Sequence, residues 1–329
     1  MFNSFFIQII NDIIHELNST TKDRYEINFL GNEFCFVIKK NNLIYQHVVG
    51  YNFDINTSST ALLCKDKYAC SILLLNNNIS SVQYKYFSID PTQNNNSILI
   101  HDIQNYCHRI KYPVVIKDNT GSCGYDVFLA NNDNDIETYT NILLQRKNAV
   151  CISKFEKIKN EYRVIYFDGN VELVYKKKKK YIIGDGVKTV RQLILEKYKN
   201  LSSIYYSNFF FSNDELQKKL STILRKNQKL ELGWKHNLSL GSTPQIIKKP
   251  HKDIITLALN AINIVGVRLA SVDIIEDING KFKIIEINGG MMMKFLSEYK
   301  TRTFSGYDFA RKMYKKILFP QQQTTCYSE

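Results

Sequence analysis

The sequence predicts an α+β protein that is built from more than one packed unit. The chain has 329 residues, which is too long for one ordinary small domain. Hydrophobic residues make up 44% of it, enough for a sizeable core, so wholesale disorder is excluded. Segments with apolar residues at helical spacing interchange with short β-branched or alternating runs, so we expect both helices and strands.

Helices are predicted where apolar side chains recur every three or four residues. Pro250 is expected to start the last of them, because proline is favoured in the first helical turn. The predicted helices cover residues 2–17, 60–74, 190–200, 213–227 and 250–265.

Strands are predicted where short β-branched or alternating runs are bounded by turn residues. Turns at Asn41-Asn42 and Asp168-Gly169 are each expected to join two strands. The predicted strands are 26–30, 33–40, 42–49, 112–117, 268–275 and 281–288, with several more between 151 and 183. The polar tail after Pro320 is expected to be loose.

Charge and cysteine usage limit the class of protein. The formal net charge of +13 favours anionic partners, namely phosphates, acidic substrates or nucleic acid. The seven cysteines show no CxxC pair or zinc spacing, so we expect free thiols in a reducing compartment. No run reaches the roughly 18 apolar residues of a membrane span, and the N-terminus lacks the features of a signal peptide. We therefore expect a soluble, cytoplasmic protein without membrane contact.

Residues 268–288 carry the argument for a metal ion. Two β-branched runs flank Asn279-Gly280, the strongest short-range signal for a two-residue hairpin turn. Such a turn places Asp273 opposite Glu286, with Asn288 two residues further along the same face. Two carboxylates across a ladder repel each other, and a cation between them would remove that penalty. Two carboxylates and an amide oxygen suit Mg²⁺; hydrated acids on an exposed face, or a bulge that shifts the register, are the alternatives.

A glycine-bearing loop follows the strand 112–117. Lys117 ends the strand, and Gly121, Ser122 and Gly124 lie in the loop. Such a loop can turn its backbone N–H groups toward an anion, and the lysine adds a point charge. The segment has neither a Walker A nor a GxGxxG pattern, so an ordinary glycine turn is the alternative.

Five lysines, Lys176 to Lys180, stand between a predicted strand and Gly184-Asp185-Gly186. Because strand side chains alternate, these lysines should point to both faces, and one or two of them could reach the phosphates of a nucleotide. A solvated basic edge is one alternative. A nucleic-acid surface is another, but no helix-turn-helix, RRM, KH or zinc-finger pattern supports it, so no nucleic-acid partner is expected.

Taken in order, these segments resemble the ATP-grasp superfamily of ATP-dependent carboxylate–amine ligases. Within it they are most similar to the ATP-grasp region of cyanophycin synthetase and of glutathione-synthetase-like ligases. The likeness runs from about residue 58 to 290. The matching stretches are TALLCKDKYACSILL, YPVVIKDNTGSCGYDV, EYRVIYFDGNVELVYKKKKKYIIGDGVKTVRQLI, HNLSLGSTPQII and SVDIIEDINGKFKIIEINGG.

The resemblance implies the ATP-grasp fold, in which two α+β subdomains sandwich ATP, here with a small N-terminal α/β domain. It divides the chain into an N-terminal domain (1–58), two ATP-grasp subdomains (59–150 and 151–319) and a C-terminal tail (320–329). The implied enzyme is a ligase that joins a carboxylate to an amine through an acyl-phosphate, releases ADP and phosphate, and acts on an amino acid or peptide. An ATP-grasp small-molecule kinase and a nucleotide-binding pseudoenzyme are the alternatives. ATP and Mg²⁺ are the implied cofactors, with Mn²⁺ as an alternative ion, and a homo-oligomer is an open alternative.

The resemblance also implies roles for individual residues. Lys67 and Lys117 correspond to the lysines that hold ATP phosphates, and the loop with Gly121, Ser122 and Gly124 closes over them. The other implied nucleotide-binding residues are Lys154 and Phe155, in the hinge strand against adenine, and Glu161, which binds ribose hydroxyls. The implied catalytic residues are Arg163, Lys176 and Lys177, the metal ligands are Asp273, Glu286 and Asn288, and the substrate-side residues are Asn237 and Gly289.

Three places depart from the family pattern. Ser153 and Lys154 stand in the hinge where acids are common, and Asp126 stands where a third loop glycine is common. Gly289-Gly290 replaces a Gly-Pro-Gly-like turn, so the substrate can differ as well. Outside the motifs, His236 and His251 are expected to be surface or capping histidines, and Trp234 to lie in the core or a lid.

Overall fold

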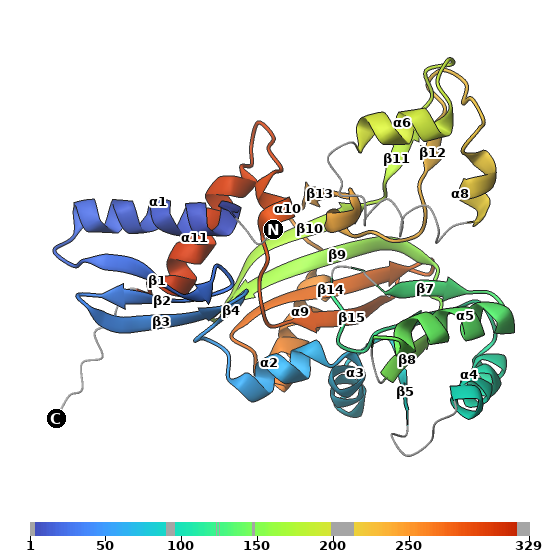
Figure 1. The fold of residues 1–329 in the computed structure, drawn as a ribbon, viewed down its shortest axis with the longest axis horizontal. Coiled ribbons are helices and arrows are strands. Elements are labelled where there is room, and N and C mark those ends of the chain that lie inside the picture. The colour runs from blue at the N-terminus through green and yellow to red at the C-terminus, as the bar shows by residue number, and fades with distance from the viewer. Residues whose placement is uncertain are drawn as a thin grey trace. The chain divides into compact units, whose positions relative to one another are not determined.

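The computed structural model describes residues 4–89, 96–122, 124, 126–146, 149–198 and 214–320. They form two compact units, which we describe separately (Figure 1). The first unit comprises the described residues of Met1–Ala61, Val267–Ala270 and Asn288–Glu329, and the second those of Leu62–Gly266 and Ser271–Ile287.

The first unit is an antiparallel sheet with helices from both ends of the chain. Phe6 of the first helix meets Tyr314 of the last one, with ring centroids 4.8 Å apart. Asn41 and Asn42 have left-handed φ angles of 52° and 68°, as the predicted turn requires. The elements are α1 (Ser4–Thr20), β1 (Tyr25–Asn32), β2 (Cys35–Lys40), β3 (Leu43–Val49), β4 (Asn52–Phe53), α10 (Lys294–Ser297) and α11 (Gly306–Leu318), and the strand order is β1-β2-β3-β4. The predicted first helix and first three strands are confirmed.

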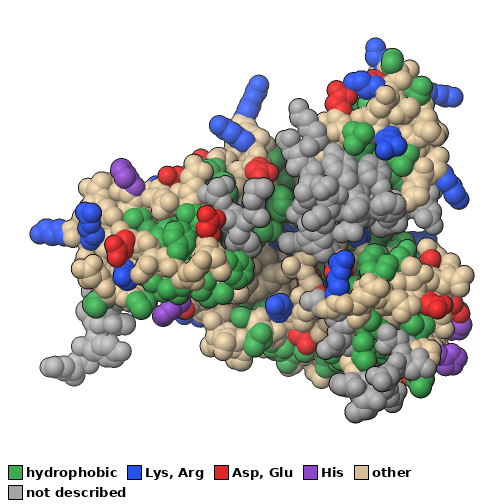
Figure 2. Space-filling view, in the orientation of Figure 1, with side chains coloured by type: hydrophobic (Ala, Val, Ile, Leu, Met, Phe, Trp, Pro, Cys, Tyr) green, Lys and Arg blue, Asp and Glu red, His purple; other side chains and the backbone are tan. Residues whose placement is uncertain are grey.

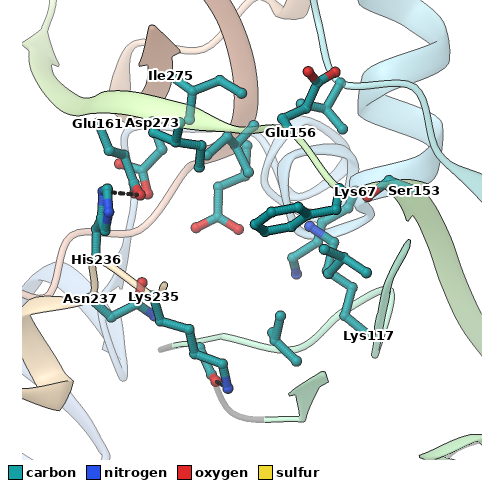
Figure 3. A pocket seen from close by; sticks show the side chains of 18 of the residues that line it. Lys67, Lys117, Ser153, Glu156, Glu161, Lys235, His236, Asn237, Asp273 and Ile275 are labelled. Carbon is teal, nitrogen blue, oxygen red and sulfur yellow. Dashed lines mark hydrogen bonds and ion pairs between the residues drawn. The ribbon is translucent and has the colours of Figure 1, made fainter. Parts of the chain in front are cut away.

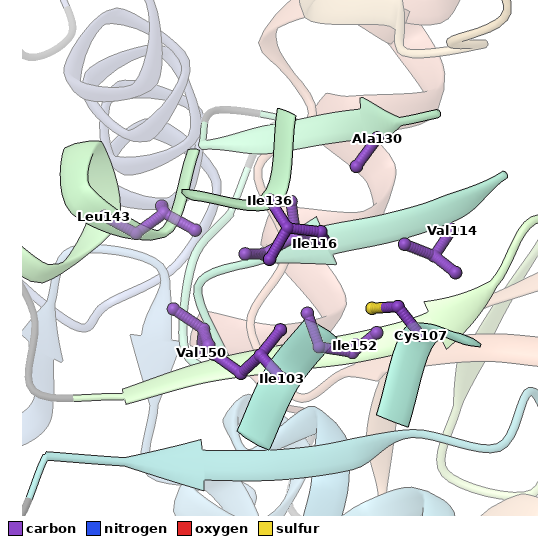
Figure 4. Packing of buried hydrophobic residues seen from close by; sticks show 9 residues of the cluster. All are labelled: Ile103, Cys107, Val114, Ile116, Ala130, Ile136, Leu143, Val150 and Ile152. Carbon is purple, nitrogen blue, oxygen red and sulfur yellow. The ribbon is translucent and has the colours of Figure 1, made fainter. Parts of the chain in front are cut away.

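The second unit contains two larger antiparallel sheets. One has the order β5-β8-β6-β7, and Figure 4 shows the apolar cluster in which Ile116 and Ile152 of this sheet pack with Ile103 and Ile136 of two helices. The elements of this layer are β5 (Lys85–Ser88), α4 (Asn96–Ile110), β6 (Val114–Lys117), β7 (Val127–Ala130), α5 (Asp133–Leu144) and β8 (Ala149–Lys154). The predicted strand at 112–117 is therefore confirmed as β6.

The other sheet has the order β13-β10-β9-β14-β15. Its elements are β9 (Ile158–Phe167), β10 (Asn170–Lys178), β13 (Thr243–Ile246), α9 (Lys252–Val265), β14 (Leu269–Asp277) and β15 (Phe282–Asn288). The predicted turn at Asp168-Gly169 is confirmed, because Asn170 pairs with Phe167 across it. The helix α9 follows His251, whose Nδ1 accepts a hydrogen bond from the Asp253 N–H, so His251 is the expected capping histidine.

A small lobe of the second unit follows β10. It consists of β11 (Tyr181–Ile183), α6 (Val190–Lys197), α8 (Asp214–Lys219) and β12 (Lys229–Glu231). Its core includes Ile182, Val190, Ile194 and Leu232. Figure 2 shows Lys and Arg side chains standing apart on this lobe.

Two predicted helices are wrong in extent. Residues 60–74 form two helices, α2 (Ser58–Lys65) and α3 (Lys67–Asn76), because the Asp66 side chain accepts from the Ala69 N–H and begins a new helix. The helix predicted over 213–227 ends at Lys219. Beyond it the Thr222 carbonyl accepts from the Val190 N–H, so tertiary hydrogen bonds replace helical ones.

Two expectations about chain class also meet the structure. The described cysteines are free thiols. Among the described residues, no helix has the length and apolar character needed to cross a membrane. The tail after Pro320, predicted to be loose, lies outside the described residues.

Candidate functional site

The second unit contains a pocket that is lined by both of its larger sheets (Figure 3). The strands β6 and β8 of one sheet and β9, β14 and β15 of the other contribute to it, together with the loop after β6 and the segment 234–237. Of the residues predicted from sequence to form a site, the lining contains Lys67, Lys117, Gly121, Ser122, Gly124, Lys154, Phe155, Glu161, Asn237, Asp273 and Glu286.

Two buried lysines occupy one side of the pocket. Lys117 Nζ donates to the Tyr84 hydroxyl at 2.8 Å, and Lys67 Nζ donates to the carbonyls of Asn119, at 3.3 Å, and Gly121. The partners that these two lysines have among the described residues are thus carbonyl and hydroxyl oxygens, not carboxylates. Burial lowers the pKa of Lys117 to about 8, while Glu286 opposes and Lys67 reinforces that shift. Buried cations without a paired carboxylate are suited to an anionic ligand.

A cluster of four charged side chains reaches another side of the pocket through two of its members, Glu161 and Asp273. Arg163 on β9 donates from Nε and Nη2 to the two oxygens of Asp273 on β14, both at 2.6 Å. Lys177 on β10 donates to Asp273 Oδ2 at 2.7 Å and to Glu161 Oε1 at 2.6 Å. Two cations thus balance two carboxylates, which makes their burial tolerable. Glu161 and Arg163 share this face because they are two residues apart on one strand.

Lys177 and Lys176 separate as strand alternation predicts. Lys177 is 3% exposed and belongs to the charged cluster. Lys176, its neighbour on β10, is not among the residues that line the pocket. Lys177 does not line the pocket either, but its ion pairs join it to Glu161 and Asp273, which do.

The hairpin between β14 and β15 differs from the predicted two-residue turn. The Asp277 N–H donates to the Lys281 carbonyl at 2.9 Å, and the Gly280 N–H donates to the Asp277 carbonyl at 3.1 Å. With Gly280 at a φ of +79°, the loop has three residues, 278–280. The strand pairs next to the turn are therefore offset by one from the predicted register, in which Ile278 faced Lys281.

Asp273 and Glu286 nevertheless line the same pocket. Ile285, the neighbour of Glu286, lines it too, and β15 is the edge strand of its sheet. Because Arg163 and Lys177 already compensate Asp273, repulsion between acids is not a reason for a cation here. The carboxylate oxygens still suit Mg²⁺ in kind.

The third predicted metal ligand, Asn288, is the last residue of β15 and belongs to the first unit. Gly289 belongs to that unit as well, and its carbonyl accepts from Asn56 Nδ2 at 2.8 Å. No cluster of three or more His, Cys, Asp and Glu suited to a metal occurs in the described parts of the chain. The predicted ligand set has only two such residues, Asp273 and Glu286, because its third member, Asn288, is an amide.

The loop after β6 packs closely on the segment 234–237. A Cβ built on Gly124 would lie 1.9 Å from Asn237 Nδ2, and Gly124 has a φ of +73°. Asp126, where a glycine is common in the family, also has a left-handed φ, of 52°. Glycine at position 124 therefore permits both the backbone conformation and the approach of Asn237.

The hinge residues bring an aromatic pair to the pocket. The Phe155 N–H donates to the Pro113 carbonyl at 3.1 Å, which holds the chain where β8 ends. The ring of Phe155 meets that of Trp234 edge-on, with centroids 5.7 Å apart. Phe155 and Trp234 both line the pocket, so they offer flat apolar surfaces to a ligand.

Sequence reasoning missed His236. It is 2% exposed and lines the pocket, so the expectation of a surface or capping histidine is wrong. Lys235 and Tyr84 were also missed, and burial lowers the pKa of Lys235 to about 8. A signal was available, since His236 directly precedes Asn237, which the family resemblance had singled out, and Lys235 lies two residues before it.

Comparison with known protein families agrees with this arrangement. Residues 64–181 match the model of the RimK-like ATP-grasp domain. The chain contains an ATP-grasp domain. This domain includes Lys67, Lys117, Glu161 and Lys177, all of which line the pocket or belong to its charged cluster. The resemblance stated from the sequence is confirmed.

Solved structures of two ligases are similar to this chain, and the first of them shows the same fold. The bifunctional glutathione synthetase from Pasteurella multocida matches with a TM-score of 0.52 and 17% identity, over 89% of this chain and 42% of that one. The D-alanine–D-alanine ligase from Bacillus anthracis matches with a TM-score of 0.46 and 13% identity, over 71% of this chain and 60% of that one. The chain therefore spans less than half of the glutathione synthetase. No curated protein matches the chain significantly. The predicted α+β, ATP-grasp class of fold is confirmed, and the family match supports an enzyme.

Proposed function

We propose that the chain is an ATP-dependent carboxylate–amine ligase that acts on an amino acid or a peptide. In this reaction an oxygen of the substrate carboxylate attacks the γ-phosphorus of ATP, ADP leaves, and an acyl-phosphate forms. The amine nitrogen of the second substrate then attacks the acyl carbon, loses a proton and expels phosphate. The product is an amide or peptide bond.

The observation that carries this proposal is the division of charge across one pocket. Lys67 and Lys117 supply buried positive charge, and their partners among the described residues are carbonyl and hydroxyl oxygens. Glu286 and the cluster around Asp273 supply carboxylates in the same pocket. Phosphoryl transfer needs mainly positioning and charge neutralisation, and this arrangement can provide both.

Individual residues have separate proposed roles. Lys67 and Lys117 would bind phosphate oxygens, and the loop with Gly121, Ser122 and Gly124 would cover them. Lys177 and Arg163, held in place by their bonds to Asp273, would present positive charge to the transferring group or to the substrate carboxylate. The rim with Asn237 is the proposed substrate side.

The metal is proposed on the chemistry of its ligands. Asp273, Glu286 and Asn288 carry hard oxygen ligands of the kind that hold Mg²⁺ or Mn²⁺. When bound, the ion would neutralise phosphate charge and hold the phosphates in line for transfer.

The experiment is a screen of amino-acid and peptide pools with ATP and Mg²⁺, read by phosphate release and mass spectrometry. In a second series hydroxylamine is added, because it intercepts an acyl-phosphate as a hydroxamate. We expect ADP, phosphate and a hydroxamate in the pool that contains the carboxylate substrate. A phosphorylated product without hydroxamate would indicate a kinase instead, and absence of ADP release with every pool would contradict the proposal.

A matched pair of lysine variants links the activity to the pocket. Lys117→Met removes a pocket cation and should abolish turnover, whereas Lys188→Met removes an exposed lysine outside the pocket lining and should retain it. Equal losses in the two variants would contradict the assignment of the pocket.

A further inference from the structure

His236 is a buried histidine whose ring lacks hydrogen bonds. Neither ring nitrogen bonds to any residue that the structure describes, although the side chain is only 2% exposed. Its Nδ1 lies 3.4 Å from Glu161 Oε2, longer than a charge-assisted hydrogen bond (Figure 3). The partner of Glu161 is instead Lys177, at 2.6 Å.

Such an arrangement is costly unless a ligand completes it. A buried polar group that lacks a partner destabilises the fold, and most buried polar groups in proteins are satisfied. Burial lowers the pKa of His236 to about 4, and Lys179 and Lys177 add to this shift. At neutral pH the ring is therefore uncharged, with one nitrogen that accepts a hydrogen bond and one N–H that donates.

The position of His236 indicates which part of a nucleotide it would meet. Trp234, two residues earlier, forms the aromatic pair with Phe155 that suits a base. Figure 3 shows Glu161 and His236 on the opposite side of the pocket from Lys67 and Lys117, the phosphate-binding candidates. In a nucleotide the sugar joins the base to the phosphates. Its hydroxyl groups can therefore donate hydrogen bonds to the carboxylate oxygen of Glu161 and to a ring nitrogen of His236.

We propose that His236 acts together with Glu161 to bind the ribose hydroxyls, and that His236 makes the pocket selective for ribonucleotides over deoxyribonucleotides. The inference rests on the proposed function, because it assumes that ATP occupies this pocket. The carboxylate oxygen of Glu161 and the ring nitrogen of His236, 3.4 Å apart, can accept hydrogen bonds from two neighbouring O–H groups. The hydroxyl oxygen in turn can accept from the imidazole N–H.

The test compares three nucleotides on three proteins by calorimetry, in the absence of other substrates. ATP, 2′-deoxy-ATP and 3′-deoxy-ATP are titrated into the wild-type chain, His236→Phe and His236→Gln. We expect the wild type to bind ATP about three- to tenfold more tightly than at least one deoxy analogue, the range of one net hydrogen bond. In His236→Phe that preference should disappear, and in His236→Gln, which keeps an acceptor and a donor, part of it should return.

The outcomes separate this inference from the proposed function. If the wild type binds ATP but shows no preference over either analogue, His236 does not bind the sugar. If His236→Phe weakens all three nucleotides equally, its role is structural and the inference is wrong. If the melting curve shows that His236→Phe does not fold, His236→Gln decides the test. A reduced preference for ATP in that variant supports the inference, and a full preference contradicts it. Failure of the wild type to bind any of the nucleotides would overturn the proposed function itself.

Discussion

Asp273 is held by more charged hydrogen bonds than any other side chain of the candidate site that we have described. Three of them reach it, two from Arg163 and one from Lys177. Burial alone would raise the pKa of Asp273, but the positive charges of Arg163 and Lys177 hold this pKa well below its usual range. The residue therefore anchors two cations next to the pocket in addition to any role in metal binding.

This anchoring predicts that Asp273→Asn destabilises the fold as well as the activity. The substitution leaves buried positive charge uncompensated, which costs about 3–5 kcal/mol. Urea unfolding at pH 7 measures the change, with Glu196→Gln as the control, because Glu196 forms an exposed pair with Lys188 and should change stability little. Because the pKa of Asp273 is lowered by folding, its contribution is present above about pH 4 and is lost as the pH falls below that. A loss no larger than in the control would contradict this reading.

Lys117 predicts a pH dependence of nucleotide binding. Its pKa of about 8 means that it loses its charge as the pH rises through 8. ATP affinity should be greatest below pH 8 and fall about tenfold by pH 9, when most of the lysine is neutral. Isothermal titrations between pH 7 and 9.5 measure this.

A second lysine must be separated from Lys117 in that experiment. Burial also lowers the pKa of Lys235 to about 8. Lys117→Met should bind weakly with a flattened profile, whereas Lys235→Met should keep most of the fall. A profile unchanged in Lys117→Met would assign the titration elsewhere.

Among the elements of the site, the loop after β6 depends on one glycine. Gly124 combines a φ of +73° with a close approach to Asn237. Gly169 has a φ of +92° but no atom within 4 Å of the position of its Cβ. A substitution at Gly169 therefore tests backbone strain alone, whereas one at Gly124 tests strain together with steric overlap.

Gly124→Ala should displace the loop and lower kcat/KM about a hundredfold, as expected for misplaced phosphate-binding groups. Gly169→Ala should cost only the strain of its left-handed backbone, about 1–2 kcal/mol of stability, and leave kcat/KM unchanged. Kinetics and thermal unfolding of both variants give the comparison. Similar kinetics for Gly124→Ala and the wild type would show that the loop does not need this close contact.

At the level of the whole chain, the first unit joins segments from opposite ends of the sequence. Glu16 on α1 accepts from Lys315 on α11 at 2.8 Å and from Arg311. Phe6 on α1 packs on Tyr314 of α11, and both side chains are nearly fully buried. The last helix therefore completes the core that begins with the first one.

A double-mutant cycle tests that core. Phe6→Ala and Tyr314→Ala should each destabilise the protein by about 3–5 kcal/mol, with a coupling energy of about 0.5–1.5 kcal/mol for the aromatic pair. Denaturant unfolding of the wild type, both single variants and the double variant provides the four values. Additive losses would show that the two helices stabilise the unit independently.

The predicted division of the chain at residues 58, 150 and 319 stays a prediction.

Local patterns along the chain were sufficient to predict many of the helices, strands and turns of this molecule. The apolar spacing of 2–17, the Asn41-Asn42 turn and the strand that ends at Lys117 depend on neighbouring residues, and each has the predicted form. The order of the motifs also led to the ATP-grasp fold, because that order is a property of the chain itself. Alternation along β10 likewise separated Lys177 from Lys176.

Contacts between distant segments required the folded protein. The capture of Asp273 by Arg163 and Lys177 joins three strands, and no spacing along the chain specifies which strands are neighbours. The return of α11 to α1 and the burial of His236 have the same origin. One additional residue in the β14–β15 loop shifted the register, since strand parity changes with every residue that a turn gains. Residue patterns determine the local backbone, whereas the environment of a side chain depends on which surfaces meet when the chain folds.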